Sequence, residues 1–246
     1  MEGAYRGCAA VGCGVAIEDA HPHCLRTRSG PRGRTPWSLP VVAVQLWFRT
    51  GSAREGVGLH GAAHFLEHMV FKGAGARGAH DIVEAIEAKG GQINAATGYE
   101  RTSFQVRGMA DVLTLGLEIC ADLIRRPTLA AEDLVREKQV VGQEIAEAAD
   151  TPDDRVFDLA QGVAFEGQAL GRPILGTTES VDAATPARLS AFHQGYYAPE
   201  RLCVAVAGRV DEDDLLRRVE ALFGDMQPSP AVRRRRRPLR SAAEIV

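Results

Sequence analysis

Two histidines that enclose a glutamate, in the run His64-Phe-Leu-Glu67-His68, constrain this chain more than any other feature of its sequence. The stretch 61–73 has no proline and carries apolar bulk, which predicts a helix closed by Gly73 as its C′ residue. In a helix, His64 and His68 share one face, so both imidazoles can reach one metal ion. Glu67 would lie beside that ion, free to act on a water molecule.

The motif does not complete a metal site by itself. The order His-x-x-Glu-His is a signature of zinc peptidases, whose catalytic zinc takes three protein ligands and keeps a fourth position for water. A second helix should supply the third ligand, and the best candidate is Glu144, with Glu137 two turns before it on the same face. Five-residue matches often arise by accident, and histidines at this spacing more often lie on a solvated helix face. The motif therefore needs support from its context.

Several blocks of the chain resemble the pitrilysin and mitochondrial-processing-peptidase family of zinc metallopeptidases, in its N-terminal catalytic half. Residues 61–73 are similar to the zinc-binding helix of that family, and residues 91–97 to its active-site edge strand. Residues 175–179 and 196–208 resemble its later blocks. The similarity extends from about Val41 to Phe223, and several blocks in the right order are far more specific than the short motif.

The resemblance implies a ligand set. In the family, a glutamate about 76 residues after the second histidine is the third ligand, and here 144 − 68 = 76. It therefore assigns one Zn²⁺ per chain to His64, His68 and Glu144. Glu67 would take a proton from water and pass it to the leaving amine, and Glu137 matches the supporting glutamate of the catalytic site. Glu144 is preferred over other acidic residues of its helix because of this spacing.

Residues 92–96 and 102–107 are predicted to form an antiparallel hairpin around Gly98. In the family, the first of these strands is an exposed sheet edge that the substrate joins as an extra strand, through backbone hydrogen bonds that demand little of its side chains. Asn94 and Ala95 match the substrate-contacting positions. An ordinary sheet edge is the alternative interpretation.

The remaining pattern predicts an α+β fold, a two-layer domain of helices packed on a mainly antiparallel sheet. Thr128 is a plausible N-cap for the helix that carries Glu137 and Glu144. We expect a metallopeptidase half-domain over 37–226, a poorly recognisable N-terminal extension over 1–36, and a Pro/Arg-rich linker or tail over 227–246. The other expected strands are 41–50 and 202–207. The other expected helices are 79–89, 111–124, 154–166, 185–192 and 211–224.

Composition narrows the classes of function. The net charge is −3, so the arginine run 233–237 is not taken as a nucleic-acid site, and no run of 18 apolar residues predicts a membrane span. No signal peptide is recognised and the five cysteines are scattered, which favours the cytoplasm. A cysteine and histidine group near the start fits no standard zinc spacing; its members are Cys8, Cys13, His21, His23 and Cys24.

The prediction is a zinc-dependent endopeptidase that hydrolyses extended or unfolded peptides. Full members of the family carry a second, similar half-domain that closes over the first, and this chain ends where the linker to it should begin. A fragment, a half-enzyme completed by another chain and a self-assembling enzyme all remain open. The alternatives are a non-catalytic or partner-dependent subunit of a processing-peptidase-like complex, and a metal-dependent enzyme acting on a small molecule.

Overall fold

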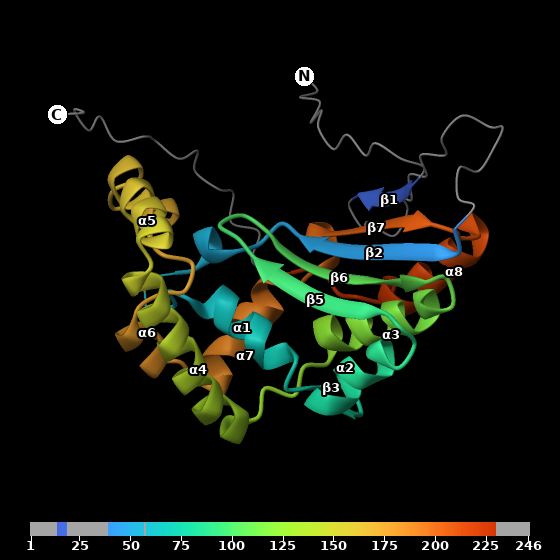
Figure 1. Ribbon diagram of the computed structural model, residues 1–246, viewed down its shortest axis with the longest axis horizontal. Helices are drawn as coiled ribbons and strands as arrows, with labels where there is room; N and C mark the ends of the chain where they lie inside the picture. Colours follow the sequence, from blue (N-terminus) through green and yellow to red (C-terminus); the bar gives the residue numbers. More distant parts are fainter. Residues whose placement is uncertain (1–13, 19–38, 57, 230–246) are drawn as a thin grey trace.

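The computed structural model describes residues 14–18, 39–56 and 58–229, and it consists of two layers (Figure 1). A five-stranded sheet has the order β1-β7-β2-β6-β5, and every neighbouring pair is antiparallel. Helices pack against one face of this sheet, which is the predicted α+β architecture. The cysteine and histidine group between Cys8 and Cys24 and the arginine run 233–237 lie outside the described residues.

The four predicted strands are all present, as β2, β5, β6 and β7, and the structure adds three more. Strand β1 lies inside the segment 1–36, and it pairs with β7 from Gly14 opposite Ala207 to Glu18 opposite Cys203. A separate two-stranded sheet joins β3 to β4 directly after the motif helix. The strands are β1 Gly14–Glu18, β2 Val41–Phe48, β3 Gly73–Ala74, β4 Arg77–Gly78, β5 Gln92–Thr97, β6 Thr102–Met109 and β7 Leu202–Gly208.

The helices confirm most of the predicted ranges. Thr185 and Asp211 cap α7 and α8 through their side chains, and Asp133 lies in the first turn of α4, where the helix dipole favours an acid. The α-helices are α1 Ala62–Val70, α2 Ala79–Glu87, α3 Val112–Arg125, α4 Ala131–Asp150, α5 Pro152–Ala164, α6 Thr178–Asp182, α7 Pro186–Tyr196 and α8 Glu212–Phe223. Short 3-10 turns lie at Ser52–Arg54, Ala169–Gly171 and Pro199–Arg201.

Two predicted helix boundaries were wrong. Helix α1 ends at Val70, and Gly73 begins β3 instead of serving as a C′ residue. Helix α4 begins at Ala131 after Ala130 as its N-cap, so Thr128 does not cap it. Thr128 instead donates its backbone N–H to the carbonyl of Gly73 at 2.8 Å, which joins the two segments.

Alternation along the strands places the core between the sheet and the helices. In β2, every second side chain is buried, and the residues between them are half-buried on the other face. Strand β7 repeats this pattern, as does β6 from Thr102 to Val106, and their buried apolar residues join those of α1, α2 and α3 in one hydrophobic core. The sheet residues of this core are Val42, Val44, Leu46, Phe48, Phe104, Val106, Leu202, Val204 and Val206.

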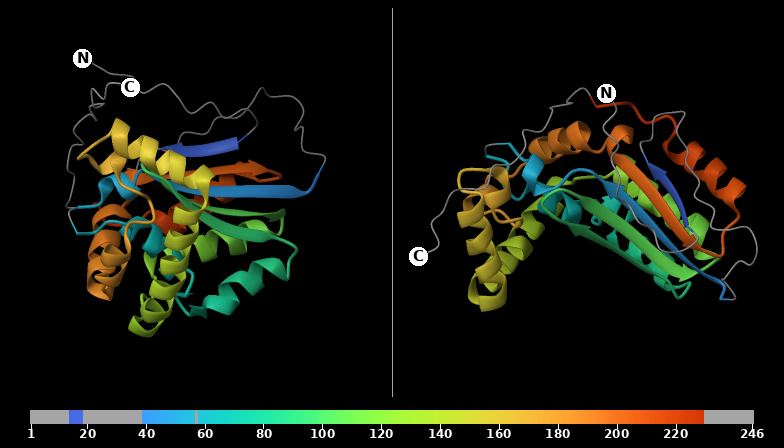
Figure 2. Two further views of the ribbon diagram at one scale, coloured as in Figure 1. Left: turned by 60° about the vertical axis from the view of Figure 1, so that its left-hand side comes forward. Right: turned by 90° about the horizontal axis from the view of Figure 1, so that it is seen from above.

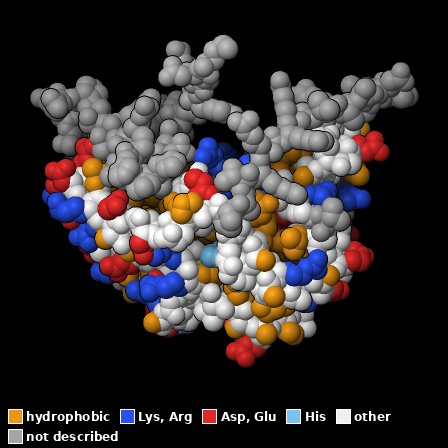
Figure 3. All heavy atoms as spheres, turned by 180° about the vertical axis from the view of Figure 1, so that it is seen from behind, with side chains coloured by type: hydrophobic (Ala, Val, Ile, Leu, Met, Phe, Trp, Pro, Cys, Tyr) orange, Lys and Arg blue, Asp and Glu red, His pale blue; other side chains and the backbone are white. Residues whose placement is uncertain are grey.

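The surface of the molecule carries both charged and apolar side chains. Figure 2 shows the sheet curving over the helices, with α4 and α5 forming a hairpin at one end of the molecule. On the face shown in Figure 3, basic and acidic side chains alternate over the surface, and apolar side chains gather between them. Among the described residues, no helix has the length and apolar character needed to span a bilayer.

The N-terminus of α1 is held by tertiary contacts. Gly61 precedes the helix with φ +82°, and a Cβ at this position would lie 2.4 Å from the carbonyl oxygen of Leu175. The carboxylate of Glu55 accepts the backbone N–H groups of Gly61 and Ala63 at 2.9 and 2.8 Å. Since a helix leaves its first N–H groups unpaired, Glu55 caps α1 from the loop that precedes it.

We expect Gly61→Ala to lower the free energy of unfolding by about 2 kcal/mol or more, because it combines a left-handed backbone with a collision. Gly90→Ala is the matched control, since Gly90 has φ +69° but a Cβ there meets nothing within 4 Å. The control should cost about 1 kcal/mol. Urea unfolding of both variants measures the difference, and equal losses would show that the contact with Leu175 does not constrain the helix.

Candidate metal centre

Helix α1 presents the motif as one open face. Of its nine residues, six are buried in the core, and His64, Glu67 and His68 are the three that keep partial exposure. These three lie one turn apart or adjacent, so they share one side of the helix. The apolar residues between them anchor α1 and thereby fix the direction of the three polar side chains.

Helix α4 supplies the opposing face. Its buried residues are Leu134, Glu137 and Val141, and Glu144 continues this line at the same helical phase. Helix α1 packs against α4, which brings the two lines of side chains together. Residues far apart in the sequence therefore meet at one place, as predicted for His64, His68 and Glu144.

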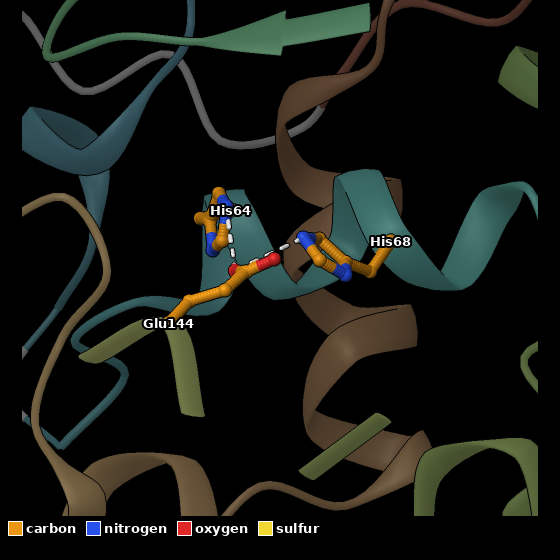
Figure 4. Close-up of side chains that lie close together, drawn as sticks. All are labelled: His64, His68 and Glu144. Carbon is orange, nitrogen blue, oxygen red and sulfur yellow. Dashed lines mark ion pairs between the residues drawn. The ribbon is translucent and has the colours of Figure 1, made fainter. Parts of the chain in front are cut away.

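The donor atoms of these three residues converge (Figure 4). The carboxylate of Glu144 points between the two imidazole rings, with its Oε2 3.7 Å from Nε2 of His64 and 3.5 Å from Nε2 of His68. The three ligand atoms all lie within 4.8 Å of one another. The side chain of Glu144 is 36% exposed, so the group is open to solvent on one side.

The arrangement fits a zinc ion. Ligand bonds of about 2.0–2.2 Å in a tetrahedral site separate the donor atoms by about 3.3–3.6 Å, close to the 3.7 and 3.5 Å between the Glu144 oxygen and the two imidazole nitrogens. The buried Oε2 of Glu144 and the buried Nδ1 of His64 have no hydrogen-bond partner among the described residues, and an orphaned carboxylate oxygen between two imidazoles is costly unless a cation binds there. Two imidazoles and one carboxylate are also an established donor set for zinc.

Electrostatics favour the ligand state of His64. Burial, with a smaller contribution from the neighbouring His68, lowers the pKa of His64 to about 4. Its imidazole is therefore neutral at neutral pH and offers a nitrogen lone pair to a metal. A protonated ring would instead repel the ion.

Glu67 has the environment of a general base. Burial raises the pKa of its carboxyl group, while hydrogen bonds from the side chain and backbone of Thr97 act in the opposite direction. One carboxylate oxygen, Oε2, is buried without a hydrogen-bond partner. A carboxylate with a raised pKa is a stronger base, and an unpaired oxygen can accept a proton from water.

Glu137 contacts a ligand and stays away from the centre of the cluster. Its Oε2 lies 3.1 Å from Nδ1 of His68, and its Oε1 pairs with Nζ of Lys72 at 2.7 Å. A carboxylate that accepts Nδ1–H leaves Nε2 of the same imidazole with its lone pair. Glu137 therefore lies against Nδ1 of His68, and its supporting role stays a prediction.

Asn94 and Ala95 lie on β5, the edge strand beside α1. The side-chain oxygen of Asn94 accepts the backbone N–H of Ala95 at 2.9 Å, so this N–H points away from β6. At the end of the strand, the Thr97 hydroxyl lies 3.5 Å from the Ala63 carbonyl of α1. The edge strand and the metal centre are thus joined directly, although neither residue reaches the metal ligands in the contacts described.

The sequence did not identify three residues that support the centre. Lys72 lies one turn after His68, and that spacing was the only available signal for it. Glu55 and Arg172 belong to loops: the Arg172 guanidinium donates to the Glu55 carbonyl at 3.0 Å and lies 2.9 Å from Nε2 of His60. Their contact spans more than a hundred residues, so local patterns carry no trace of it.

Comparison with known proteins adds an independent line of evidence. The model of the insulinase family, peptidase family M16, matches residues 38–178, and the model of the M16 inactive domain matches residues 183–245. An uncharacterized zinc protease of Mycobacterium leprae is 41% identical over 204 residues, covering 82% of this chain and 46% of that protein. The uncharacterized zinc protease YmxG of Bacillus subtilis is 36% identical over 186 residues, covering 76% of this chain and 45% of that protein.

Solved structures share the fold. A protease from Helicobacter pylori superimposes with a TM-score of 0.75 at 23% identity, over 83% of this chain and 49% of that one. Pitrilysin superimposes with a TM-score of 0.70 at 23% identity, over 78% of this chain and 21% of its own. The chain therefore spans about half the length of the curated relatives named above.

Zinc should raise the midpoint of thermal unfolding of the metal-free chain, because it binds the folded state and not the scattered ligands of the unfolded chain. A free zinc concentration of 100 Kd corresponds to about 2.7 kcal/mol. Glu144→Ala should lose most of this stabilisation. Glu147→Ala, an exposed acid on the same helix, should keep it. Equal zinc responses in the two variants would remove Glu144 from the ligand set.

Proposed function

We propose that this chain, which belongs to the insulinase family of peptidases (peptidase family M16), is a zinc-dependent endopeptidase unit that hydrolyses extended or unfolded peptides. The observation that supports this most is the convergence of His64, His68 and Glu144, with Glu67 beside them on α1. Relatives at 36–41% identity are named zinc proteases, which fits this donor set.

Each residue of the cluster has a separate role in the proposed reaction. In this proposal His64, His68 and Glu144 hold one Zn²⁺, which when bound polarises the substrate carbonyl and lowers the pKa of water. Glu67 accepts the proton of the attacking water and returns it to the leaving amine. Glu137 orients His68 through Nδ1.

The edge strand β5 is proposed to bind the substrate. An extended peptide placed beside β5 would pair with its outward N–H and C=O groups, including the N–H of Ala95 that Asn94 now covers. Because this pairing uses the backbone, it favours extended peptides over small molecules, and it selects weakly among sequences. The contact between Thr97 and Ala63 would hold the bound peptide close to α1.

Helix α5 supports the need for a second half-domain or a partner chain. None of its residues is buried, and four apolar side chains project from it: Val156 is 55% exposed, Phe157 72%, Leu159 53% and Val163 59%. Apolar helix surfaces of this kind usually meet a partner. Since the M. leprae relative extends beyond the matched region, which is 46% of its length, we propose that a homologous half-domain covers α5. The alternative is a partner-dependent, non-catalytic subunit.

Glu67→Gln should keep zinc and lose turnover, because glutamine is a close steric match that cannot accept the proton. We expect peptide hydrolysis to fall by at least about 100-fold, within the usual contribution of general acid–base catalysis. The measurement is cleavage of a quenched fluorescent peptide by the zinc-loaded chain, with zinc content determined in parallel. His64→Ala should lose both zinc and turnover.

Each outcome of this experiment supports or excludes one of the interpretations of the chain. Retained hydrolysis in Glu67→Gln would exclude Glu67 as the base. Hydrolysis that disappears in the variant would establish that the chain, alone or self-associated, completes its own site. If the unmodified chain binds zinc without cleaving the peptide, a second half-domain is required, and addition of that half should restore cleavage. Failure to restore it would favour the non-catalytic subunit.

Ala95→Pro should raise KM for a long unstructured peptide by about tenfold, because proline removes an outward N–H that pairs with the substrate. The fold should tolerate the change, since proline is accepted on edge strands where the N–H faces away from the sheet. Ala95→Ser keeps the N–H and is the control. Equal KM values for the two variants would show that the peptide does not pair with β5 at this residue.

A further inference from the structure

We propose that Lys72 is a positioning residue of the metal centre, which holds Glu137 in place so that His68 presents Nε2 to the metal. The inference rests on the proposed zinc site. It assigns a role to the lysine that follows the motif helix, a residue outside the ligands, the base and the substrate strand.

The Glu137 carboxylate is shared between two partners. One oxygen lies 3.1 Å from Nδ1 of His68, and the other lies 2.7 Å from Nζ of Lys72. The Glu137 side chain is only 6% exposed, whereas that of Lys72 is 34% exposed. The lysine therefore brings a solvated charge to the rim of a buried carboxylate, and each oxygen has one strong partner.

The backbone fixes where the ammonium group can go. Helix α1 ends at Val70, and the N–H groups of Phe71 and Lys72 still bond to the carbonyls of His68 and Met69, at 3.3 and 3.1 Å. Lys72 thus follows His64 and His68 at intervals of four residues and remains on their side of the helix. Its side chain extends from this anchored position to the oxygen of Glu137 that faces away from His68.

Removing the lysine would leave a buried carboxylate with one partner. A carboxylate without its charged partner is costly at low exposure, and it can recover by rotating toward solvent. Rotation would break the contact with Nδ1 of His68, which sets the tautomer and the orientation of the ring. Lys72 would therefore influence the metal only through Glu137 and His68.

The direction in which zinc affinity changes when Lys72 is removed distinguishes this positioning role from a direct effect of the lysine charge. A lysine ammonium near a divalent cation repels it, so its removal would strengthen zinc binding if charge acted directly. Loss of the support behind His68 would weaken zinc binding instead. Outer-shell partners of metal ligands typically change metal affinity by about 10–100-fold, which is large enough to measure.

The test is zinc affinity by competition with a chromophoric chelator, on the whole chain. We expect Lys72→Met to weaken zinc binding by about 10–100-fold and Lys72→Arg, which keeps a charged donor, to recover most of the loss. Lys138→Met is the matched control, because Lys138 is next to Glu137 but donates to the Asp182 carbonyl. Its zinc affinity should stay within about twofold of the original.

A double-mutant cycle tests the route through Glu137. In a Glu137→Gln background, Lys72→Met should change zinc affinity by less than about twofold, because the partner through which it acts is gone. A second readout needs no metal: the ¹⁵N shifts of His68 should report one tautomer in the unmodified chain and a mixture in Lys72→Met. Far-UV circular dichroism checks folding, and Lys72→Gln replaces Lys72→Met if the latter fails to fold.

The outcomes distinguish this inference from the proposed function. If the unmodified chain binds zinc no better than His64→Ala, the proposed zinc site is wrong. If it binds zinc but Lys72→Met binds it equally or more tightly, the positioning role of Lys72 is wrong and the site stands. An undiminished effect of Lys72→Met in the Glu137→Gln background would likewise overturn the route through Glu137.

Discussion

The packing of α1 against α4 is the contact on which the whole centre depends. Helix α1 is short, yet six of its nine residues are buried against the sheet, so it cannot rotate without exposing core side chains. Helix α4 packs against it, and the buried residues of α4 are Leu134, Glu137 and Val141. The polar contact of Glu137 with His68 lies inside this apolar interface, where any shift would leave a buried carboxylate unpaired. The candidate metal site is therefore preorganised by packing.

Much of the fold follows from periodicity, because most elements are long and strongly patterned. The two wrong helix boundaries have one cause. Gly73 and Thr128 were assigned as helix caps from local residue types, but they pair with each other, next to a bridge between Ala74 and Pro127. Leu129 then takes φ +49°, which delays the start of α4. A tertiary pairing of this kind overrides capping preferences, and no local pattern announces it.

In the candidate site too, local sequence patterns predict some residues and miss those that depend on tertiary contacts. The relation of His64, Glu67 and His68 follows from helical geometry alone, and the structure places all three on one face. The choice of Glu144 among several acids on α4 needed the resemblance to a family, since every acid on an exposed helix looks alike in sequence. The sequence does not identify Lys72, because its partner Glu137 lies on another helix (137 − 72 = 65 residues later). Local chemistry identifies ligands more readily than their supports.

Two surfaces of this chain, the edge strand β5 and the apolar side of α5, are available for binding. Strand β5 is at the edge of the sheet, with no further strand beside it among the described residues. Helix α5 exposes apolar side chains, and the Tyr99 hydroxyl of the β5–β6 turn bonds to Gln161 of this helix. Open sheet edges and apolar helix surfaces are liabilities in a protein without partners. The proposed function uses both features, since a substrate strand would complete the sheet and a second half-domain would cover the helix. The cluster of His64, His68 and Glu144 is held on α1 and α4, so in this proposal a partner need only bring a peptide to it.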